Sequence, residues 1–89
     1  MHHLKLVVSQ DHITNGKRGH SRMCPIALST KEQMPGCSVI VSSNGIYVHL
    51  QEPFKFIGNS ELPRAAAHFI KRFDAGLPVE PIEFEVDLT

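Results

Sequence analysis

The sequence predicts a small α+β domain in which two helices pack on one face of a mostly antiparallel sheet. Apolar residues that alternate with other residues indicate strands near both ends of the chain and in its middle. Segments between these strands carry helix end signals or apolar residues at helical spacing. The 89 residues, 42% of them hydrophobic, suffice for one modest core and a single domain over residues 1–89.

The first part of the chain predicts one strand and two short helices. Residues 4–8 alternate and form a strand with one apolar face. Ser9 is a suitable N-cap for a single helical turn, which Asn15-Gly16 ends. Pro25 suits a first helical position because its nitrogen carries no hydrogen, and it predicts a helix over 24–33 that a following Pro-Gly pair ends.

The middle of the chain predicts a β-hairpin. Two apolar runs flank Asn44-Gly45, a strong short-range hairpin signal. A two-residue turn at this pair places Val41 opposite Val48. The valines then share the apolar face, and Tyr47 and His49 lie on the other face.

The last third predicts an edge strand over 54–57, a turn over 58–60, a helix and a final strand. The helix runs from Leu62-Pro63 to Gly76 and buries one apolar face. That face comprises Leu62, Ala66, Phe69, Ile70 and Phe73. Residues 82–88 alternate apolar and acidic side chains, and we expect this strand to pair with the first one, with Lys5 near an acidic neighbour. The order is β-α-α-β-β-(β)-α-β, with three to five strands in the sheet.

Charge is balanced over the chain but unevenly placed. Nine Lys and Arg residues match nine Asp and Glu residues, so the basic excess of non-specific nucleic-acid binders is absent. Residues 17–31 contain basic and no acidic residues, and residues 78–89 contain the reverse. The sequence has no apolar run of the ~20 residues that span a membrane, and Cys24 and Cys37 without a secretion signal predict reduced thiols in the cytoplasm.

Two short boxes carry a resemblance to other proteins. Cys-Pro-Ile-Ala-Leu at 24–28 and Phe-Ile-Lys-Arg-Phe-Asp-Ala-Gly at 69–76 resemble short uncharacterised proteins of bacteriophages and some bacteria, with the outline CPIAL…LPxxAxxFIxxFDxG. The likeness extends from about Asp11 to Val86, and the chain departs from it at Ser29 and Ile82. It implies a phage origin, hence the host cytoplasm, and no established activity. Small phage proteins often bind and block a host factor, so it also favours an inhibitor of a host protein.

The basic loop over 16–25 is the first candidate site. Lys17, Arg18, His20 and Arg22 are its predicted ligand- or partner-binding residues. The N–H groups of residues 26 and 27 and the positive end of the helix dipole favour an anion beside these side chains. A phosphate, a nucleic-acid backbone or an acidic protein fits this loop, and a merely solvated loop is the alternative.

Two further surfaces are candidates. Arg64 and His68 form a basic stripe with Lys71, either a second anion contact or a solvated helix face. Tyr47 with His49 is either a base-stacking platform or one ordinary exposed tyrosine beside a histidine.

Catalysis and metal binding receive less support from the sequence. Cys24 lies at a helix start beside His20, where a thiol pKa falls, yet no carboxylate in this box orients a base, so we favour a packed cysteine. A zinc site from His20, Cys24, Cys37 and either His12 or His49 lacks the paired spacing of such sites. The sequence therefore predicts no catalytic residue, no metal and no cofactor.

Three functions follow in order of preference. The first is a non-enzymatic phage-type binding module that modulates or inhibits a host protein, such as a defence component. The second is a small anion, nucleotide or nucleic-acid binding protein that uses loop 16–25. The third is a Cys24-dependent enzyme. The open edge at 54–57 also allows a homodimer.

Overall fold

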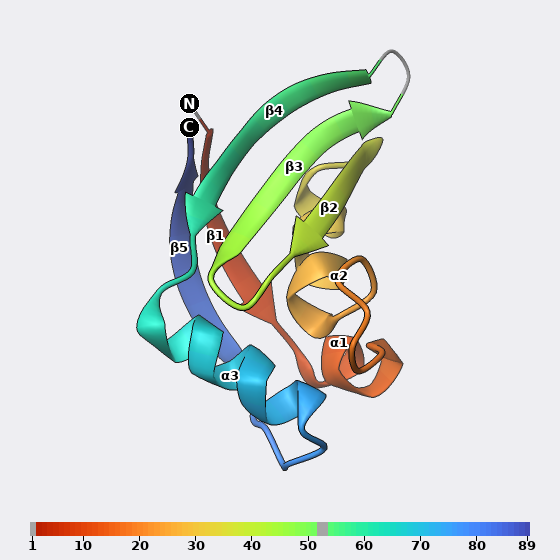
Figure 1. The fold of residues 1–89 in the computed structure, drawn as a ribbon, viewed down its shortest axis with the longest axis vertical. Helices are drawn as coiled ribbons and strands as arrows, with labels where there is room; N and C mark the ends of the chain where they lie inside the picture. The colour runs from red at the N-terminus through yellow and green to blue at the C-terminus, as the bar shows by residue number, and fades with distance from the viewer. Residues whose placement is uncertain (1, 52–53) are drawn as a thin grey trace.

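The computed structural model of this chain describes residues 2–51 and 54–89. It has the predicted α+β class and order of elements, including the edge strand. The strands are β1 (His2–Val8), β2 (Cys37–Val41), β3 (Gly45–Gln51), β4 (Phe54–Glu61) and β5 (Ile82–Leu88), and the helices are α1 (Gln10–Asn15), α2 (Pro25–Gln33) and α3 (Arg64–Asp74). In Figure 1, α1 and α3 lie at the end of the molecule opposite the two chain termini.

In the described part of the chain, the strands form two antiparallel sheets instead of one. β1 pairs with β5, and β2, β3 and β4 form a three-stranded sheet in that order. The backbones of Asn59 and Thr89 join the sheets, because each donates its N–H to the other's carbonyl oxygen, at 3.1 and 2.9 Å. The three-stranded sheet lies in front of β1 and β5 in Figure 1.

The predicted pairing of the first and last strands is confirmed. Lys5 lies directly opposite Glu85, and its Nζ is 3.6 Å from a carboxylate oxygen of Glu83. His3 contacts Asp87 at 2.6 Å and Glu85 at 2.8 Å. These hydrogen bonds, to Asp87 first and Glu85 second, raise the pKa of His3 above its ordinary value. The acidic face of β5 is therefore matched by basic side chains of β1.

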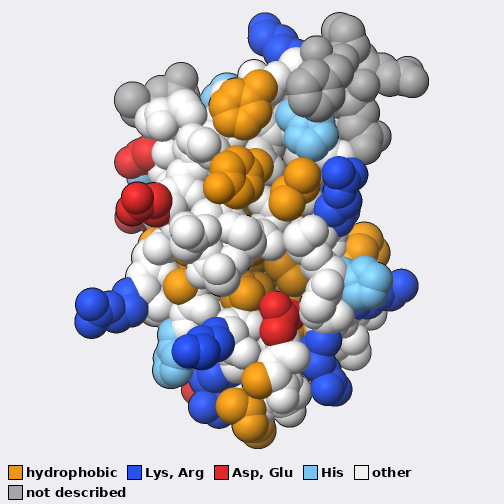
Figure 2. All heavy atoms as spheres, viewed as in Figure 1, with side chains coloured by type: hydrophobic (Ala, Val, Ile, Leu, Met, Phe, Trp, Pro, Cys, Tyr) orange, Lys and Arg blue, Asp and Glu red, His pale blue; other side chains and the backbone are white. Residues whose placement is uncertain are grey.

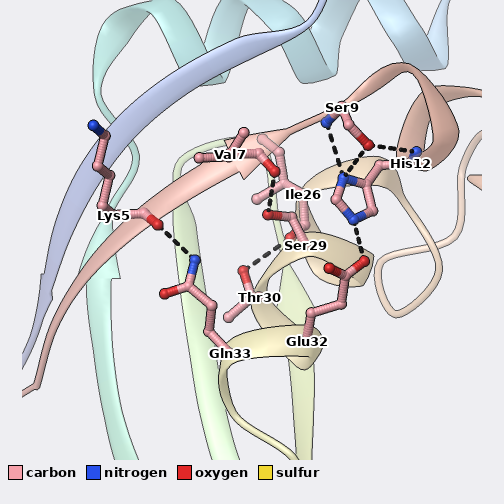
Figure 3. A network of polar contacts seen from close by, with 9 residues as sticks. All are labelled: Lys5, Val7, Ser9, His12, Ile26, Ser29, Thr30, Glu32 and Gln33. Atoms are coloured by element: carbon pink, nitrogen blue, oxygen red, sulfur yellow. Dashed lines mark hydrogen bonds and ion pairs between the residues drawn. The ribbon is translucent and has the colours of Figure 1, made fainter.

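Helix α2 covers the edge of β1 that faces away from β5 (Figure 3). Ser29 Oγ donates to the carbonyl of Val7 at 3.0 Å, and the Gln33 amide donates to the carbonyl of Lys5. Two side chains thus take the hydrogen bonds that a further strand would make, and this edge of β1 is protected from pairing with another chain. Ser29, where the resembled proteins suggest a small apolar residue, is buried because its hydroxyl has this partner.

Helix α1 begins with a capping box in which a histidine takes the position usual for Glu or Gln (Figure 3). The Ser9 N–H donates to His12 Nδ1 at 2.9 Å, so Nδ1 is an acceptor. The hydrogen of the neutral ring is then on Nε2, which contacts the Glu32 carboxylate on α2. The His12 side chain is only 11% exposed, and this contact ties α1 to α2.

The predicted hairpin exists, but its predicted register is wrong by two residues. Val41 lies opposite Ile46 and Val39 opposite Val48. The turn sits one residue earlier than expected, because Ser42 Oγ accepts the Gly45 N–H at 3.1 Å and holds the chain there. A turn of type I′ at Asn44-Gly45 requires positive φ at both residues, and neither has it. A shift of two preserves the faces, so the predicted buried valines are still buried.

The predicted turn over 58–60 is also wrong, because these residues continue β4. Asn59 pairs with Tyr47 and Ser60 with Ile46. The glycine that suggests a turn is instead a point of close approach. A Cβ at Gly58 would lie 3.0 Å from Cβ of Leu88, so a side chain here would push the two sheets apart. A bulge beside Val48 and His49 bends the strand.

The core lies between the two sheets and receives one face of α2 and of α3. All five residues of the predicted apolar face of α3 are buried, and Phe69 stacks on Phe73 with ring centroids 6.4 Å apart. The alternate residues of β1 and β5 and the valines of the hairpin belong to the same cluster. One contiguous core thus fixes the position of α3 relative to the loop before α2.

Candidate functional site

A groove of about 1170 Å³ lies between three segments that are distant in the sequence. One wall is α3, another is the loop that leads into α2, and the third is the turn between β2 and β3. Figure 2 shows it as a hollow in the lower half of this face, with apolar side chains on its floor and basic side chains around it. Its volume slightly exceeds the ~300–1,000 Å³ that is typical of small-molecule pockets.

The groove brings together the two basic segments that the sequence suggests. His20 comes from the loop, and Arg64, His68 and Lys71 come from successive turns of α3. All four side chains are exposed. Among the described residues that line the groove, Asp74 is the one acidic residue. One of the Asp74 carboxylate oxygens accepts the Gly19 N–H at 3.0 Å. Basic side chains therefore outnumber acidic ones at this site.

The loop wall is held in place by hydrogen bonds to several elements. Gly19 is joined to the end of α3 through Asp74, and the Ser21 carbonyl accepts the Val41 N–H of β2 at 2.8 Å. The Arg22 carbonyl accepts from Lys31 of α2 at 2.7 Å. Gly19 has φ +70°, a conformation that glycine adopts readily. These hydrogen bonds hold the loop in a defined position along the groove.

The other predicted loop residues lie outside the groove. Lys17 and Arg22 are exposed and are not among its lining residues. Arg18 extends to the end of α3, where a Cβ at Gly76 would lie 2.8 Å from its Nη1. The predicted site is therefore divided: His20, Arg64 and His68 share one cavity, and Lys17, Arg18 and Arg22 do not line it.

The start of α2 does not offer its amides to a ligand. Cys24 is the N-cap, and its Sγ accepts the Ala27 N–H at 3.4 Å. Ile26 and Ala27 are fully buried. The expected anion contact at residues 26 and 27 is therefore wrong, because a sulfur and the core occupy the place that a ligand would need.

Cys24 lies at the floor of the groove as a protonated thiol. Burial raises the pKa of the Cys24 thiol. Backbone hydrogen bonds from Ala27 and Ile26 lower this pKa, but the effect of burial is larger. Both Cys24 and Cys37 are free. A buried thiol with a raised pKa is a weak nucleophile, so Cys24 contributes apolar surface and a helix cap to this site.

Sequence reasoning missed part of the groove. Ser42 and Ser43 enter it from the β2–β3 turn, and no sequence signal connects them to α3. Lys71, which the sequence places in the basic stripe with Arg64 and His68, does line the groove. The apolar floor includes Val41 and Ile70. From the sequence alone, both residues are predicted only to belong to the hydrophobic core.

The outer face of the three-stranded sheet carries a second candidate surface on the same side of the molecule. Tyr47 is 39% exposed and Phe56 is 52% exposed. Phe56 lies opposite His49, so both side chains are on the face that Tyr47 occupies. Phe56 thus adds a second ring to the pair that the sequence suggests.

Within residues 2–51 and 54–89, no three His, Cys, Asp or Glu side chains are grouped closely enough to hold a metal ion. The described helices include none that is long and apolar enough to cross a membrane. No family model, curated protein or solved structure matches this chain.

Proposed function

We propose that this protein is a non-enzymatic binding protein for a phosphate-bearing, nucleotide-class ligand, which it holds in the groove between α3 and the loop. The observation that carries the proposal is the meeting of basic side chains from two distant segments around an apolar floor. This function is the second of the three that the sequence suggests. The proposed binding site is now the groove between α3 and the loop, whereas the sequence suggests the loop alone.

The rim of the groove suits an anion. Arg64 and Lys71 are charged at neutral pH, and an arginine can donate two parallel hydrogen bonds to a phosphate. His20 and His68 add ring nitrogens that can donate further hydrogen bonds to it. The single carboxylate of Asp74 already accepts a backbone N–H, which leaves less of its charge to repel a phosphate.

The floor of the groove suits a flat apolar group. Ile70 and Val41 are buried beneath the rim, and Ser42 and Ser43 bring hydroxyls to its edge. Ligand sites usually combine such an apolar lining with a few polar groups that fix orientation. A nucleotide has both parts, a charged phosphate and a flat base, whereas an inorganic anion would leave the floor without a contact.

Two other expectations stay predictions. A host protein as partner agrees with the suggested phage origin, but a concave basic site with an apolar floor fits a small ligand or a single strand better than a flat protein surface. A Cys24-dependent enzyme is the weakest reading, because burial keeps this thiol protonated. The groove supplies binding groups, and its cysteine serves as a helix cap.

The test is thermal unfolding with adenosine monophosphate, adenosine and inorganic phosphate as probes. At 100 times its dissociation constant, a ligand stabilises the folded state by about 2.7 kcal/mol. In a domain of this size each kcal/mol raises Tm by about 4–8 °C. We expect a rise with adenosine monophosphate and smaller rises with the other two, because each lacks one of the two parts.

The variant for this test is Arg64→Gln/Lys71→Gln, which removes two positive charges from the groove. The matched control is Lys5→Gln/Lys17→Gln, which removes two positive charges from residues that do not line it. We expect the first variant to lose the rise and the control to keep it. Equal responses of the two variants, or no rise with wild-type protein, would overturn the proposal.

A further inference from the structure

We infer that the ligand of the groove is a single-stranded nucleic acid, whose chain continues from the groove onto the outer face of the three-stranded sheet. The inference rests on the proposed function, because the groove supplies the contact to the phosphates. It adds the bases: Tyr47 and Phe56 form the surface on which they stack.

The outer face has the chemistry of a stacking surface. By register, Ile40, Tyr47, His49 and Phe56 share this face, since Ile40 lies opposite Tyr47 and Phe56 opposite His49. On β3, Ile46 and Val48 alternate with Tyr47 and His49, point into the core and are fully buried. The rings of Tyr47 and Phe56 are therefore supported from below and open to solvent above.

The spacing of the rings suits separate bases. Tyr47 and His49 lie two residues apart on β3, about 7 Å along the strand. Phe56, the partner of His49, is therefore a diagonal neighbour of Tyr47, at about 7–8 Å. Flat rings spaced along a sheet can each take one base, and this contact tolerates any sequence because every base has a flat face.

The aromatic face is continuous with the groove. The Tyr47 ring leans over Gly45, where a Cβ would lie 3.5 Å from its hydroxyl oxygen. Gly45 follows the turn whose Ser42 and Ser43 line the groove. Figure 2 shows the two surfaces on one side of the molecule, with the apolar side chains of the sheet above the hollow. A strand bound in the groove can therefore reach Tyr47 without crossing another element.

Charge favours a nucleic acid over a protein strand here. Among the described residues, the face with Tyr47 and Phe56 carries one carboxylate, that of Glu61 opposite Gly45, and the adjoining groove carries four basic side chains against the single carboxylate of Asp74. The acidic residues Glu83, Glu85 and Asp87 are on β5 and contact Lys5 or His3. A double helix is disfavoured because its bases are stacked on one another and cannot reach the rings. The volume of the groove also leaves room for more than one nucleotide.

The experiment measures fluorescence anisotropy of labelled single-stranded DNA and RNA of roughly 10 nucleotides, with a duplex of the same sequence for comparison. The variants are Tyr47→Leu and Phe56→Leu, which keep an apolar side chain. The control is Leu77→Ala, which removes exposed apolar surface that lines no part of the groove. Circular dichroism melts check that each variant folds.

We expect each ring variant to bind the single strand about 5- to 150-fold more weakly, because each loses one stacked base. The affinity of the ring variants for the single strand should depend on salt concentration as the affinity of the wild type does. Arg64→Gln/Lys71→Gln should instead flatten that dependence, by about 0.7 in the slope of log affinity against log salt for each phosphate that the variant no longer neutralises. Leu77→Ala should bind as the wild type does.

The inference is overturned if the oligonucleotide binds no more tightly than adenosine monophosphate, or if the ring variants bind it as the wild type does. It is also overturned if the duplex binds as well, or if wild-type protein is a dimer that Phe56→Glu dissociates, because the face would then be an interface between copies. In these cases a response of the groove to adenosine monophosphate still supports the proposed function. If adenosine monophosphate and the oligonucleotide both fail to bind, the proposed function fails as well.

Discussion

Replacing Gly16 by alanine should destabilise the protein, although the backbone conformation there suits alanine. Gly16 has φ −71° and ψ 155°, an extended conformation that any residue adopts. Space is the obstacle. A Cβ at this position would lie 2.7 Å from Cδ and 2.8 Å from Cγ of Pro25, and 2.9 Å from the carbonyl oxygen of His12. The Gly16 N–H donates to that same oxygen at 2.8 Å, so the backbone cannot simply move away.

Two opposing effects set the size of the loss. Alanine restricts the unfolded chain and by itself would stabilise the protein by about 0.4–1 kcal/mol. Overpacking against a buried ring and a backbone carbonyl costs about 1–3 kcal/mol. The cost exceeds the gain, and we expect a net loss of about 1–2 kcal/mol in the free energy of unfolding. In a domain of this size this corresponds to a fall in Tm of roughly 4–16 °C.

Urea denaturation followed by circular dichroism measures this loss, and Gly19 is the matched control. A Cβ at Gly19 meets no atom within 4 Å, but φ there is +70°. Asparagine tolerates positive φ better than alanine does, so Gly19→Asn should be more stable than Gly19→Ala. At Gly16 asparagine should be no better than alanine, because it is larger. If Gly16→Ala were as stable as the wild type, a Cβ at this position would not clash, and the close packing of Gly16 against Pro25 would be refuted.

The pKa shifts lead to two further predictions. His3 has a raised pKa through its hydrogen bonds to two β5 carboxylates, so its protonated form stabilises the fold. This stabilisation is complete below the unfolded pKa of about 6.5 and disappears as pH rises through the folded pKa. Urea midpoints of wild type and His3→Gln should therefore differ at about pH 5 and converge by about pH 9; a difference that grows with pH contradicts this sign. Cys24 is buried and its pKa is raised, so iodoacetamide at neutral pH should label the half-buried Cys37 faster, as mass spectrometry of the intact and digested protein can measure. Faster labelling of Cys24 would contradict its role as a protonated helix cap.

Most of the fold could be predicted from local patterns. Strict alternation in β5 and the helical spacing of the apolar residues in α3 each specify one buried face, and both faces are buried as expected. The two wrong predictions of turns share a cause. Asn44-Gly45 and Gly58 suggest turns through glycine, but Gly45 begins β3 and Gly58 is needed for the close approach of Leu88. A glycine permits a turn and also permits close packing, and only the neighbouring backbone decides between them.

The candidate site could be predicted only in part. The sequence points to a basic loop and a basic helix face separately, and His20, Arg64 and His68 do meet in one groove. Lys17 and Arg22 look equivalent to His20 in the sequence but do not line that groove. The difference comes from the docking of the loop through Gly19 and Asp74, 55 residues apart, which no local pattern reveals.

The sequence by itself determined the elements of this protein, because helix caps, turn residues and hydrophobic periodicity act over a few neighbouring residues. Only the tertiary structure decided that the strands divide into two sheets, that α2 side chains cover the edge of β1, and that two basic segments face one cavity. These features depend on contacts between residues far apart in the chain. Packing of the single core selects them, since burial of the apolar faces brings α3 and the loop before α2 to the same place.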